Sequence, residues 1–406
     1  MTPKIITDEA IIDNILSRGV EAIYPDRLSL KKLLLSGRPL RLYCGYDPTA
    51  PTLHIGHGIT IRKLAKFQAL GHHVIFLFGD FTAQIGDPTD KLAARQPLTP
   101  QQIKKNLKGW KQQIKNIIDI DRIDFQFNSR WLGKLKFADL IKISSYFTAQ
   151  QIAAREMFKQ RMAQGKDLYF HEFLYPLMQA YDSVALDVDL EIGGNDQMFN
   201  MLAGRDLMKK MLSKEKFVLT TKLLEDSSGK KMGKSEGNMI TLVDKPEEMY
   251  GKIMSWPDEL ILPAWEILTD VSDKTLLEIK NQLASKGINP RDIKMKLAKE
   301  VVEVYQGQSA ALSAEASFKR VFQEKQKPLE IPKVVIADQN GQLGILDLFV
   351  KAGLAASNSE ARRLIKEKAL RIDDKLVTDE TLQLNITTQG LLLQRGKKLF
   401  RRVFTK

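Results

Sequence analysis

Residues 43–57 are Tyr43-Cys44-Gly45-Tyr46-Asp47-Pro48-Thr49-Ala50-Pro51-Thr52-Leu53-His54-Ile55-Gly56-His57, and this stretch decides the fold. Residues 41–45 have the composition of a short strand, and the prolines at positions 48 and 51 prevent that strand from continuing. Apolar side chains then recur at helical spacing over residues 58–70. A strand that passes through such a turn into a helix is a building unit of α/β sheets, and its turn lies where these sheets bind ligands.

His54 and His57 fall close to the expected start of this helix. A helix N-terminus has unpaired N–H groups and the positive end of the helix dipole, so it favours anionic ligands. Gly56, between the two histidines, leaves room for a phosphate chain to approach the backbone. We therefore expect the polyphosphate of ATP to bind here, although the two histidines could instead be capping residues or bind a metal.

A basic motif lies far downstream, at residues 230–238, with the sequence Lys230-Lys231-Met232-Gly233-Lys234-Ser235-Glu236-Gly237-Asn238. Its glycines and serine argue against a regular element and favour a loop. Lys231 and Lys234 are spaced so that both could swing onto a triphosphate and neutralise the charge on the departing pyrophosphate. A basic loop alone could be a solvated surface, but the histidine motif favours the ATP interpretation.

His54-Ile55-Gly56-His57 and Lys231-Met232-Gly233-Lys234-Ser235 together resemble the two signature motifs of class I aminoacyl-tRNA synthetases. The first motif matches the family pattern at every position, whereas the second has Gly233 where the pattern has Ser. Two further stretches and residues 43–50 narrow the resemblance to bacterial-type tyrosyl-tRNA synthetases. These stretches are Tyr175-Pro176-Leu177-Met178-Gln179-Ala180-Tyr181-Asp182 and Gly193-Gly194-Asn195-Asp196-Gln197. The resemblance covers nearly the whole chain.

The resemblance implies a tyrosine pocket. Its members would be Tyr43 and Asp182 on the substrate phenol, Tyr175, Gln179 and Asp87 on the ammonium, and Gln197 on the carboxylate side. Tyr175, Gln179 and Asp182 are also spaced to share one helix face, where they could form an ordinary polar seam. Asp87 precedes Pro88 and could be a turn residue. A buried acceptor that phenylalanine leaves unpaired would reject that amino acid, and tyrosyl-tRNA synthetases are the standard example of such discrimination.

The same resemblance assigns the ATP contacts. They are Gly45, Asp47, Thr49, His54, Gly56 and His57 around the first motif, Gly194 and Asp196 near the ribose, Lys231 and Lys234 from the loop, and Lys91 and Arg95 as further phosphate contacts. The residues that would stabilise charge on the phosphates during reaction are His54, His57, Thr49, Lys231 and Lys234. No cluster of His, Cys, Asp and Glu has metal-ligand spacing. We therefore expect Mg²⁺ to accompany ATP, and neither a protein metal site nor a prosthetic group.

The chain has 406 residues, which is too long for one ordinary domain. Its 62 Lys and Arg against 49 Asp and Glu give a net charge of +13, which suggests a polyanionic partner. No apolar run is long enough for a membrane span, and the acidic residues Asp8, Glu9 and Asp13 argue against a signal peptide. Together with the single cysteine, Cys44, these features predict a cytoplasmic protein without membrane association.

Strand-like and helix-like segments alternate in the N-terminal half, with strands expected at 41–45, 74–78 and 187–192. This alternation predicts an α/β fold with a Rossmann-like parallel sheet. The sheet would belong to a catalytic domain over residues 1–240, and the resemblance implies a helical connective insertion at about 100–180 that carries a dimer interface.

The remainder of the chain is expected to form two smaller domains. Residues 241–325 have a helical pattern, and the resemblance makes them an anticodon-side α-helical domain. Residues 323–332 are polar and charged and contain Pro328 and Pro332, which predicts a linker placed at 326–340. Residues 341–406 would be a small C-terminal S4-like RNA-binding domain.

The expected C-terminal domain is basic, with thirteen Lys or Arg against seven Asp or Glu over residues 341–406. Ser357-Asn358-Ser359-Glu360 has the spacing of a capping box, which predicts a helix start. On that helix Arg362, Arg363 and Lys366 would share one side, so we expect them to bind RNA. The alternative is a solvated basic helix that packs only on its own protein.

The resemblance thus implies an ATP-dependent ligase. It would convert L-tyrosine to tyrosyl-adenylate and pyrophosphate, and then transfer the tyrosyl group to the 3′-terminal ribose of tRNA(Tyr). One alternative is a tryptophanyl-tRNA synthetase-like enzyme, against which the expected phenol-binding pair Tyr43 and Asp182 argues. Another is a non-catalytic RNA-binding paralogue, against which the signature motifs argue. The family also implies a homodimer.

Overall fold

The computed structural model describes the chain except residues 1–3, 89–97, 227–230, 232–238, 286, 324–330, 337–341, 387–389, 397–398 and 406. The chain divides into two compact units, Met1–Ala311 and Leu312–Lys406. Buried apolar side chains form cores within each unit.

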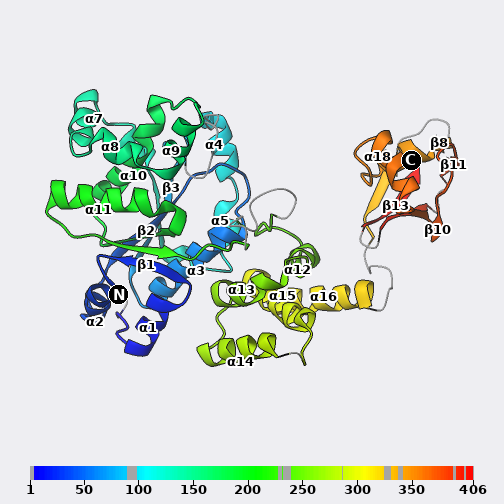
Figure 1. The fold of residues 1–406 in the computed structure, drawn as a ribbon, viewed down its shortest axis with the longest axis horizontal. Helices are drawn as coiled ribbons and strands as arrows, with labels where there is room; N and C mark the ends of the chain where they lie inside the picture. Colours follow the sequence, from blue (N-terminus) through cyan, green and yellow to red (C-terminus); the bar gives the residue numbers. More distant parts are fainter. Residues whose placement is uncertain are drawn as a thin grey trace. The chain divides into compact units, whose positions relative to one another are not determined.

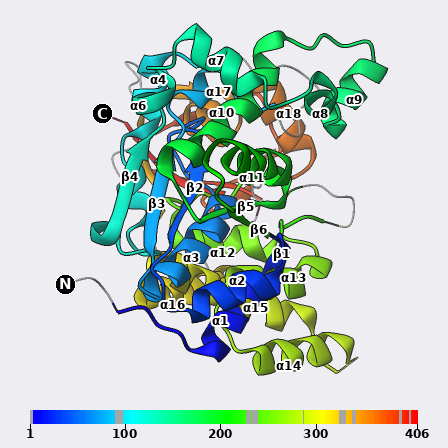
Figure 2. The same cartoon turned by 90° about the vertical axis from the view of Figure 1, so that its left-hand side faces the viewer.

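The first unit is built around a six-stranded sheet with the strand order β1-β6-β5-β2-β3-β4. The strands, side by side in Figure 2, are β1 (Val20–Tyr24), β2 (Arg41–Tyr46), β3 (His73–Phe78), β4 (Ile123–Phe127), β5 (Leu190–Gly194) and β6 (Phe217–Thr221). All neighbours pair in parallel except the edge strand β1, which is antiparallel to β6. The predicted α/β fold with a Rossmann-like sheet is confirmed, and one antiparallel edge strand is added to it.

Helices cover both faces of this sheet. α3 (Ile55–Ala69) connects β2 to β3, while α10 (Phe170–Leu186) and α11 (Met198–Leu212) pack against each other. Figure 1 shows α3 on one side of the sheet and α10 and α11 on the other. α1 (Glu9–Ser17) and α2 (Arg27–Leu35) pack together, and α2 contacts the edge strand β1.

The junction of β2 and α3 positions the site. α3 begins at Ile55, three residues before the expected start, because the two fully buried side chains Leu53 and Ile55 anchor this turn in the core. β2 lies between β3 and β5, with Tyr43 in register with Ile75 on one side and with Glu191 on the other. The carboxyl ends of these three strands therefore meet at one edge of the sheet.

The segment between β3 and β5, which contains the expected insertion, is mainly helical. Its helices before α10 are α4 (Pro100–Leu107), α5 (Trp110–Ile114), α6 (Ser129–Leu132), α7 (Phe137–Ser144), α8 (Ala149–Ala153) and α9 (Glu156–Ala163). It also contains β4, which the sequence analysis missed and which pairs in parallel with β3. Every residue of β4 is only partly buried, as befits an edge strand, and Ile123, Phe125 and Phe127 alternate with polar residues, a strand signal that was overlooked.

Helices follow the sheet in the first unit. They are α12 (Pro246–Met254), α13 (Ile261–Leu268), α14 (Asp273–Ala284), α15 (Pro290–Gln306) and α16 (Gln308–Phe318), the last of which crosses the unit boundary. α15 packs against α12, α13 and α14. Short turns of 3-10 helix lie at Thr82–Gln84, Ile120–Arg122, Asn195–Gln197 and Asp258–Leu260, and a π turn lies at Lys319–Gln323. Within the described parts of the chain, none of the helices combines the length and apolarity needed to cross a bilayer.

The second unit contains a five-stranded sheet with the order β10-β9-β12-β13-β7, and a two-stranded sheet, β11-β8. The strands are β7 (Lys333–Ile336), β8 (Gln342–Gly344), β9 (Leu370–Ile372), β10 (Lys375–Leu376), β11 (Gln383–Asn385), β12 (Leu391–Arg395) and β13 (Leu399–Thr405). Two helices, α17 (Ile345–Lys351) and α18 (Asn358–Lys366), pack with the sheet around Phe349, Leu364 and Leu393.

Two expected boundaries are wrong. The linker expected over 326–340 extends too far, because residues 333–336 form β7, which pairs in parallel with β13. Pro332, one of the two prolines that suggested a linker, directly precedes this edge strand instead. The strand expected at 187–192 begins only at Leu190, because Asp187 adopts a left-handed conformation that ends α10.

A close approach of two helices makes Gly58 necessary. An added Cβ at Gly58 in α3 would lie 2.5 Å from the hydroxyl oxygen of Tyr305 in α15 and 2.8 Å from its ring. At Gly251 in α12, by contrast, an added Cβ would meet nothing within 4 Å.

We predict that Gly58→Ala lowers the free energy of unfolding by about 1–3 kcal/mol, because the added methyl group overpacks this contact. Gly251→Ala, the matched control, should instead raise it by up to about 1 kcal/mol, because alanine favours the helix. Urea denaturation followed by circular dichroism measures both values. Equal effects of the two substitutions would contradict the close packing of α3 on α15.

Candidate active site

A cavity of about 380 Å³ opens at the carboxyl ends of β2, β3 and β5. It is lined by every described residue that the sequence predicts for ATP or tyrosine. These residues are Tyr43, Gly45, Asp47, Thr49, His54, Gly56, His57, Asp87, Tyr175, Gln179, Asp182, Gly194, Asp196, Gln197 and Lys231. Lys91, Arg95 and Lys234 lie outside the described residues. His54 and His57 thus border the same space as Lys231, which lies far from them in the sequence.

The start of α3 is held by its two histidines. His54 is the N-cap residue, and its Nδ1 accepts a hydrogen bond from the N–H of Gly56 at 3.1 Å. Nδ1 of His57 accepts from the N–H of His54 at 3.1 Å, and the two ring centroids are 3.9 Å apart. The capping interpretation is therefore correct, and it does not exclude the phosphate interpretation, since both rings still line the cavity.

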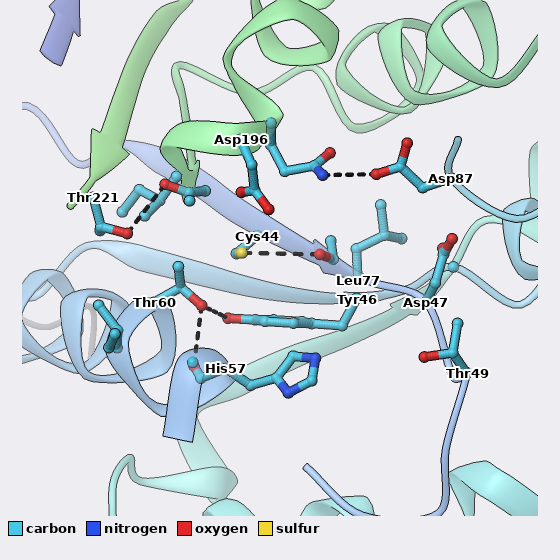
Figure 3. Close-up of a pocket in the computed structure, with 18 of the residues that line it drawn as sticks. Cys44, Tyr46, Asp47, Thr49, His57, Thr60, Leu77, Asp87, Asp196 and Thr221 are labelled. Atoms are coloured by element: carbon cyan, nitrogen blue, oxygen red, sulfur yellow. Dashed lines mark hydrogen bonds between the residues drawn. The ribbon is translucent and has the colours of Figure 1, made fainter. Parts of the chain in front are cut away.

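Asp47, expected to contact ATP, is hydrogen-bonded to a residue expected to contact tyrosine. One carboxylate oxygen accepts from the hydroxyl of Tyr175 at 2.8 Å, and the other accepts from the hydroxyl of Thr82 at 2.7 Å. Figure 3 shows Asp47 and Thr49 on the same side of the cavity, opposite Asp196. Asp47 lies just after β2 and Tyr175 lies on α10, so this hydrogen bond ties the helix to the end of the strand.

Asp182 is a buried acceptor on α10. Its carboxylate accepts from the indole N–H of Trp131 at 2.7 Å and from the amide of Asn128 at 3.2 Å. Burial raises the pKa of Asp182 well above the usual value, although these two hydrogen bonds act in the opposite direction. Trp131 and Asn128 were missed by the sequence analysis because they follow β4, the strand it did not predict.

Tyr43 faces the same space from β2 and is almost completely buried. Its hydroxyl lies 2.8 Å from Oγ of Ser183. Burial raises the pKa of Tyr43 well above 10, and the nearby carboxylates of Glu191 and Asp182 raise it further. Tyr43 therefore keeps its proton at neutral pH and can donate a hydrogen bond.

Asp87 is paired across the cavity. Its carboxylate accepts from the side-chain amide of Gln197 at 2.7 Å, the contact drawn in Figure 3. The guanidinium of Arg155 lies 3.7 Å from the other oxygen. Arg155 is buried between the rings of Phe158 and Phe199. Asp87 is thus more than a turn residue, because it links the start of α11 to the insertion.

Lys231 reaches the cavity from the basic motif. Its Nζ lies 2.7 Å from a carboxylate oxygen of Asp196, the residue expected near the ribose. The contact holds this lysine beside Asp196 at the cavity wall. Across the described parts of the chain, no group of three or more His, Cys, Asp or Glu side chains could hold a metal ion.

Several polar lining residues were not anticipated. Thr60 donates to the carbonyl oxygen of His57 at 3.0 Å and lies 2.9 Å from the hydroxyl of Tyr46, as Figure 3 shows. Glu191 accepts from the amide of Gln179 at 3.1 Å. Glu191 belongs to a strand that the sequence predicted. It stands between two apolar residues of that strand, and a buried acidic residue at such a position could have indicated a functional role.

Two family profiles match the chain. The profile of the tRNA synthetases class I (W and Y) covers residues 35–323. The profile of the tyrosine–tRNA ligase SYY-like C-terminal domain covers residues 323–403. The second match agrees with a separate C-terminal unit.

Bacterial relatives match over nearly the full length. The tyrosine–tRNA ligase of Moorella thermoacetica is 43% identical over 395 residues, which span 96% of this chain and 95% of the relative. The tyrosine–tRNA ligase of Thermotoga maritima is 40% identical over 391 residues, which span 96% of each chain.

Solved structures agree in fold. A C-terminally truncated mitochondrial tyrosyl-tRNA synthetase from Aspergillus nidulans superposes with a TM-score of 0.64 at 25% identity, over 77% of this chain and 94% of that chain. The tyrosyl-tRNA synthetase of Archaeoglobus fulgidus, solved with L-tyrosine, gives 0.61 at 24% identity, over 75% and 100%. The chain therefore belongs to the class I tRNA synthetases for tryptophan and tyrosine, and within them to the tyrosine–tRNA ligases.

Proposed function

We propose that the cavity joins L-tyrosine and ATP into tyrosyl-adenylate and pyrophosphate, and that the chain then transfers the tyrosyl group to the 3′-terminal ribose of tRNA(Tyr). The observation that carries this proposal is the meeting of His54, His57 and Lys231 with the predicted tyrosine residues around one cavity. The bacterial relatives are named tyrosine–tRNA ligases, which favours tyrosine over tryptophan.

The amino acid would bind at the end of the cavity where Tyr43 and Asp182 lie. Asp182 already has two donors and, as a carboxylate, can accept another hydrogen bond from a phenol. Tyr43 can donate to the phenol oxygen. A substrate without the hydroxyl would leave both groups unpaired in a buried site, which is unfavourable. Tyr175, Gln179 and Asp87 would surround the ammonium, and Gln197 the carboxylate.

The reaction needs no covalent enzyme intermediate. One oxygen of the substrate carboxylate attacks the α-phosphorus, the bond to the bridging oxygen breaks, and pyrophosphate leaves with the electron pair. The protein's part is to align the two substrates and to stabilise the charge that develops on the β- and γ-phosphates. His54, His57, Thr49, Lys231 and Lys234 would supply that stabilisation, and Mg²⁺ would arrive with ATP. Gly45, Asp47, Gly56, Gly194 and Asp196 would hold the rest of the nucleotide.

The direct test is pyrophosphate exchange into ATP. We predict exchange that depends on L-tyrosine, with tryptophan and phenylalanine far less effective, because neither offers a phenol to Tyr43 and Asp182. If tryptophan supported exchange as well as tyrosine does, the assignment to the tyrosine enzyme of the family would be wrong. The absence of exchange with every amino acid would indicate a binding protein without catalytic activity.

We predict that His54→Ala slows adenylate formation by about 10- to 100-fold with a smaller effect on tyrosine affinity, because charge on the phosphates grows mainly in the transition state. Single-turnover measurements separate the rate from the affinity. His73→Ala, at the exposed start of β3, is the matched control. Lost tyrosine affinity at an unchanged rate would contradict this role, and Lys234→Ala should behave as His54→Ala does.

A homodimer is proposed on the evidence of the insertion surface. Phe137 on α7 and Phe170 on α10 expose 77% and 80% of their surfaces, and Ile141, Met162 and Tyr169 are also exposed. Solvent-exposed apolar side chains that gather on neighbouring helices mark protein–protein contacts. We also propose that the enzyme works in the cytoplasm, where tRNA, tyrosine and ATP are present.

The C-terminal unit is proposed to bind tRNA as an S4-like domain, and helices α12–α15 to form the anticodon-side domain. Ser357 caps α18 and accepts from the N–H of Glu360, while the carboxylate of Glu360 accepts from Ala356. Arg362, Arg363 and Lys366 are exposed on this helix. Their charges suit a phosphate backbone.

We predict that a chain ending at Pro332 retains pyrophosphate exchange but loses at least about 10-fold in tRNA aminoacylation, because the lost basic surface contributes phosphate contacts. The full-length triple variant Arg362→Ala, Arg363→Ala, Lys366→Ala keeps the fold of the unit and isolates the charge effect. Aminoacylation at two salt concentrations should show a weaker salt dependence in both. If aminoacylation and its salt dependence both stayed unchanged, α18 would be a solvated helix that does not bind tRNA.

A further inference from the structure

A buried ion pair lies directly behind the tyrosine end of the cavity. Lys216, immediately before β6, is completely buried, and its ammonium contacts the carboxylate of Glu191 on β5. The same ammonium donates to Oγ of Ser183 at 2.9 Å and to the carbonyl oxygen of Met201 at 3.0 Å. All three of its N–H donors are therefore used. Glu191 lines the cavity, whereas Lys216 and Ser183 do not, so these two can act on a substrate only through other residues.

One arm of this network leads to Tyr43. An ammonium only donates, so Ser183 accepts from Lys216 and has one hydrogen of its own to place. Its Oγ lies 2.8 Å from the hydroxyl of Tyr43 but 3.3 Å from Glu191, so the shorter contact receives this hydrogen. Tyr43 then accepts from Ser183, so its own O–H is left to donate, either to the carboxylate of Glu191 or to a group in the cavity.

The other arm leads to Gln179. Glu191 accepts from the side-chain amide of Gln179 at 3.1 Å. A carboxylate paired with an ammonium has no hydrogen to donate, so it must face the NH₂ group of that amide. The carbonyl oxygen of Gln179 is thereby turned away from Glu191 and is available to accept from a substrate ammonium.

Stability does not explain this network. A buried ion pair loses its hydration, and replacing such a pair with apolar side chains of similar volume is often neutral or stabilising. The protein nevertheless makes room for it, because an added Cβ at Gly204 on α11 would lie 2.7 Å from the Lys216 ammonium and 2.8 Å from Oγ of Ser183. The pair instead determines which neighbouring group is the donor and which is the acceptor in each hydrogen bond of the network.

We propose that Lys216, Glu191 and Ser183 set the hydrogen-bond polarity of the tyrosine pocket, making Tyr43 a donor to the phenol and Gln179 an acceptor from the ammonium. This inference rests on the proposed function's assignment of Tyr43 and Gln179 to the substrate. Lys216 and Ser183 are positioning residues. With Tyr43 as donor, the single hydrogen of a bound phenol goes to Asp182, so tyrosine satisfies both groups at once and phenylalanine satisfies neither.

The test is Ser183→Ala, which leaves the Lys216–Glu191 contact in place and removes only the link to Tyr43. The ratio of kcat/KM for tyrosine over phenylalanine in pyrophosphate exchange should fall by about 3- to 10-fold, the effect of one ordinary hydrogen bond, while the KM for ATP stays unchanged. Ser145→Ala, an exposed serine whose hydroxyl only bonds Lys142 of its own helix, is the control and should leave the ratio unchanged.

A second variant tests the charges. Lys216→Met combined with Glu191→Gln removes both charges together, so neither partner is left buried and unpaired. The tyrosine-over-phenylalanine ratio should fall by about 10-fold or more, because both arms lose their direction, and the KM for tyrosine should rise more than kcat falls.

Tyr43→Phe separates failure of this inference from failure of the proposed pocket. If Tyr43→Phe lowers the ratio and Ser183→Ala does not, the network is overturned and the pocket stands. If neither substitution changes the ratio, the assignment of Tyr43 is wrong and the network falls with it. Equal losses with tyrosine and phenylalanine in Ser183→Ala would show a merely structural role and would also overturn the proposal.

Discussion

The site depends on one constraint, which is that several carboxylates are buried around a single cavity. An ionised carboxylate removed from water needs hydrogen-bond donors, because an unpaired buried charge is strongly destabilising. The donors are Thr82 and Tyr175 for Asp47, Gln197 and Arg155 for Asp87, Trp131 and Asn128 for Asp182, and Lys216 and Gln179 for Glu191. These donors come from the insertion, from α10, from the start of α11 and from the segment before β6. The hydrogen bonds to these carboxylates therefore hold the surrounding helices and loops on the sheet, and apolar packing acts in the same direction.

α10 shows how one helix meets this constraint and also supports the core. Tyr175, Gln179 and Asp182 face the cavity, as their spacing predicted. Leu177 and Ala180 of the same helix are buried in the apolar cluster of the insertion. A shift of the helix would expose that cluster and break the bonds to Asp47, Asp182 and Glu191 together. The face that lines the cavity is thus held in place by the opposite face of the helix, and the expected polar seam is itself part of the cavity wall.

The sequence predicted the residues that carry the motifs far better than the residues that support them. His54, His57, Asp182 and Lys231 lie in segments whose patterns are local, so spacing and resemblance were enough to place them at one site. Trp131, Ser183 and Lys216 act through contacts between segments distant in sequence, and no local pattern shows which buried serine or lysine faces a carboxylate. The same reason explains β4 and β7. Both are short edge strands whose identity depends on a distant partner strand. Residues 333–336 lack the apolar alternation of a half-buried strand, whereas Ile123, Phe125 and Phe127 do alternate with polar residues, and this signal was overlooked.

The glycines of the motifs have a different meaning in the structure from the one the sequence suggested. Gly56 was interpreted as room for a phosphate chain, yet an added Cβ there would first meet the ring of His54 at 2.9 Å. An added Cβ at Gly194 would lie 2.6 Å from the carboxylate of Asp196, and one at Gly79, a cavity-lining glycine outside the motifs, would lie 2.0 Å from that of Asp47. These glycines make room for the protein's own polar side chains. A glycine beside a charged residue therefore marks the place where a neighbouring polar side chain packs against the backbone. It gives only indirect information about where a ligand would bind.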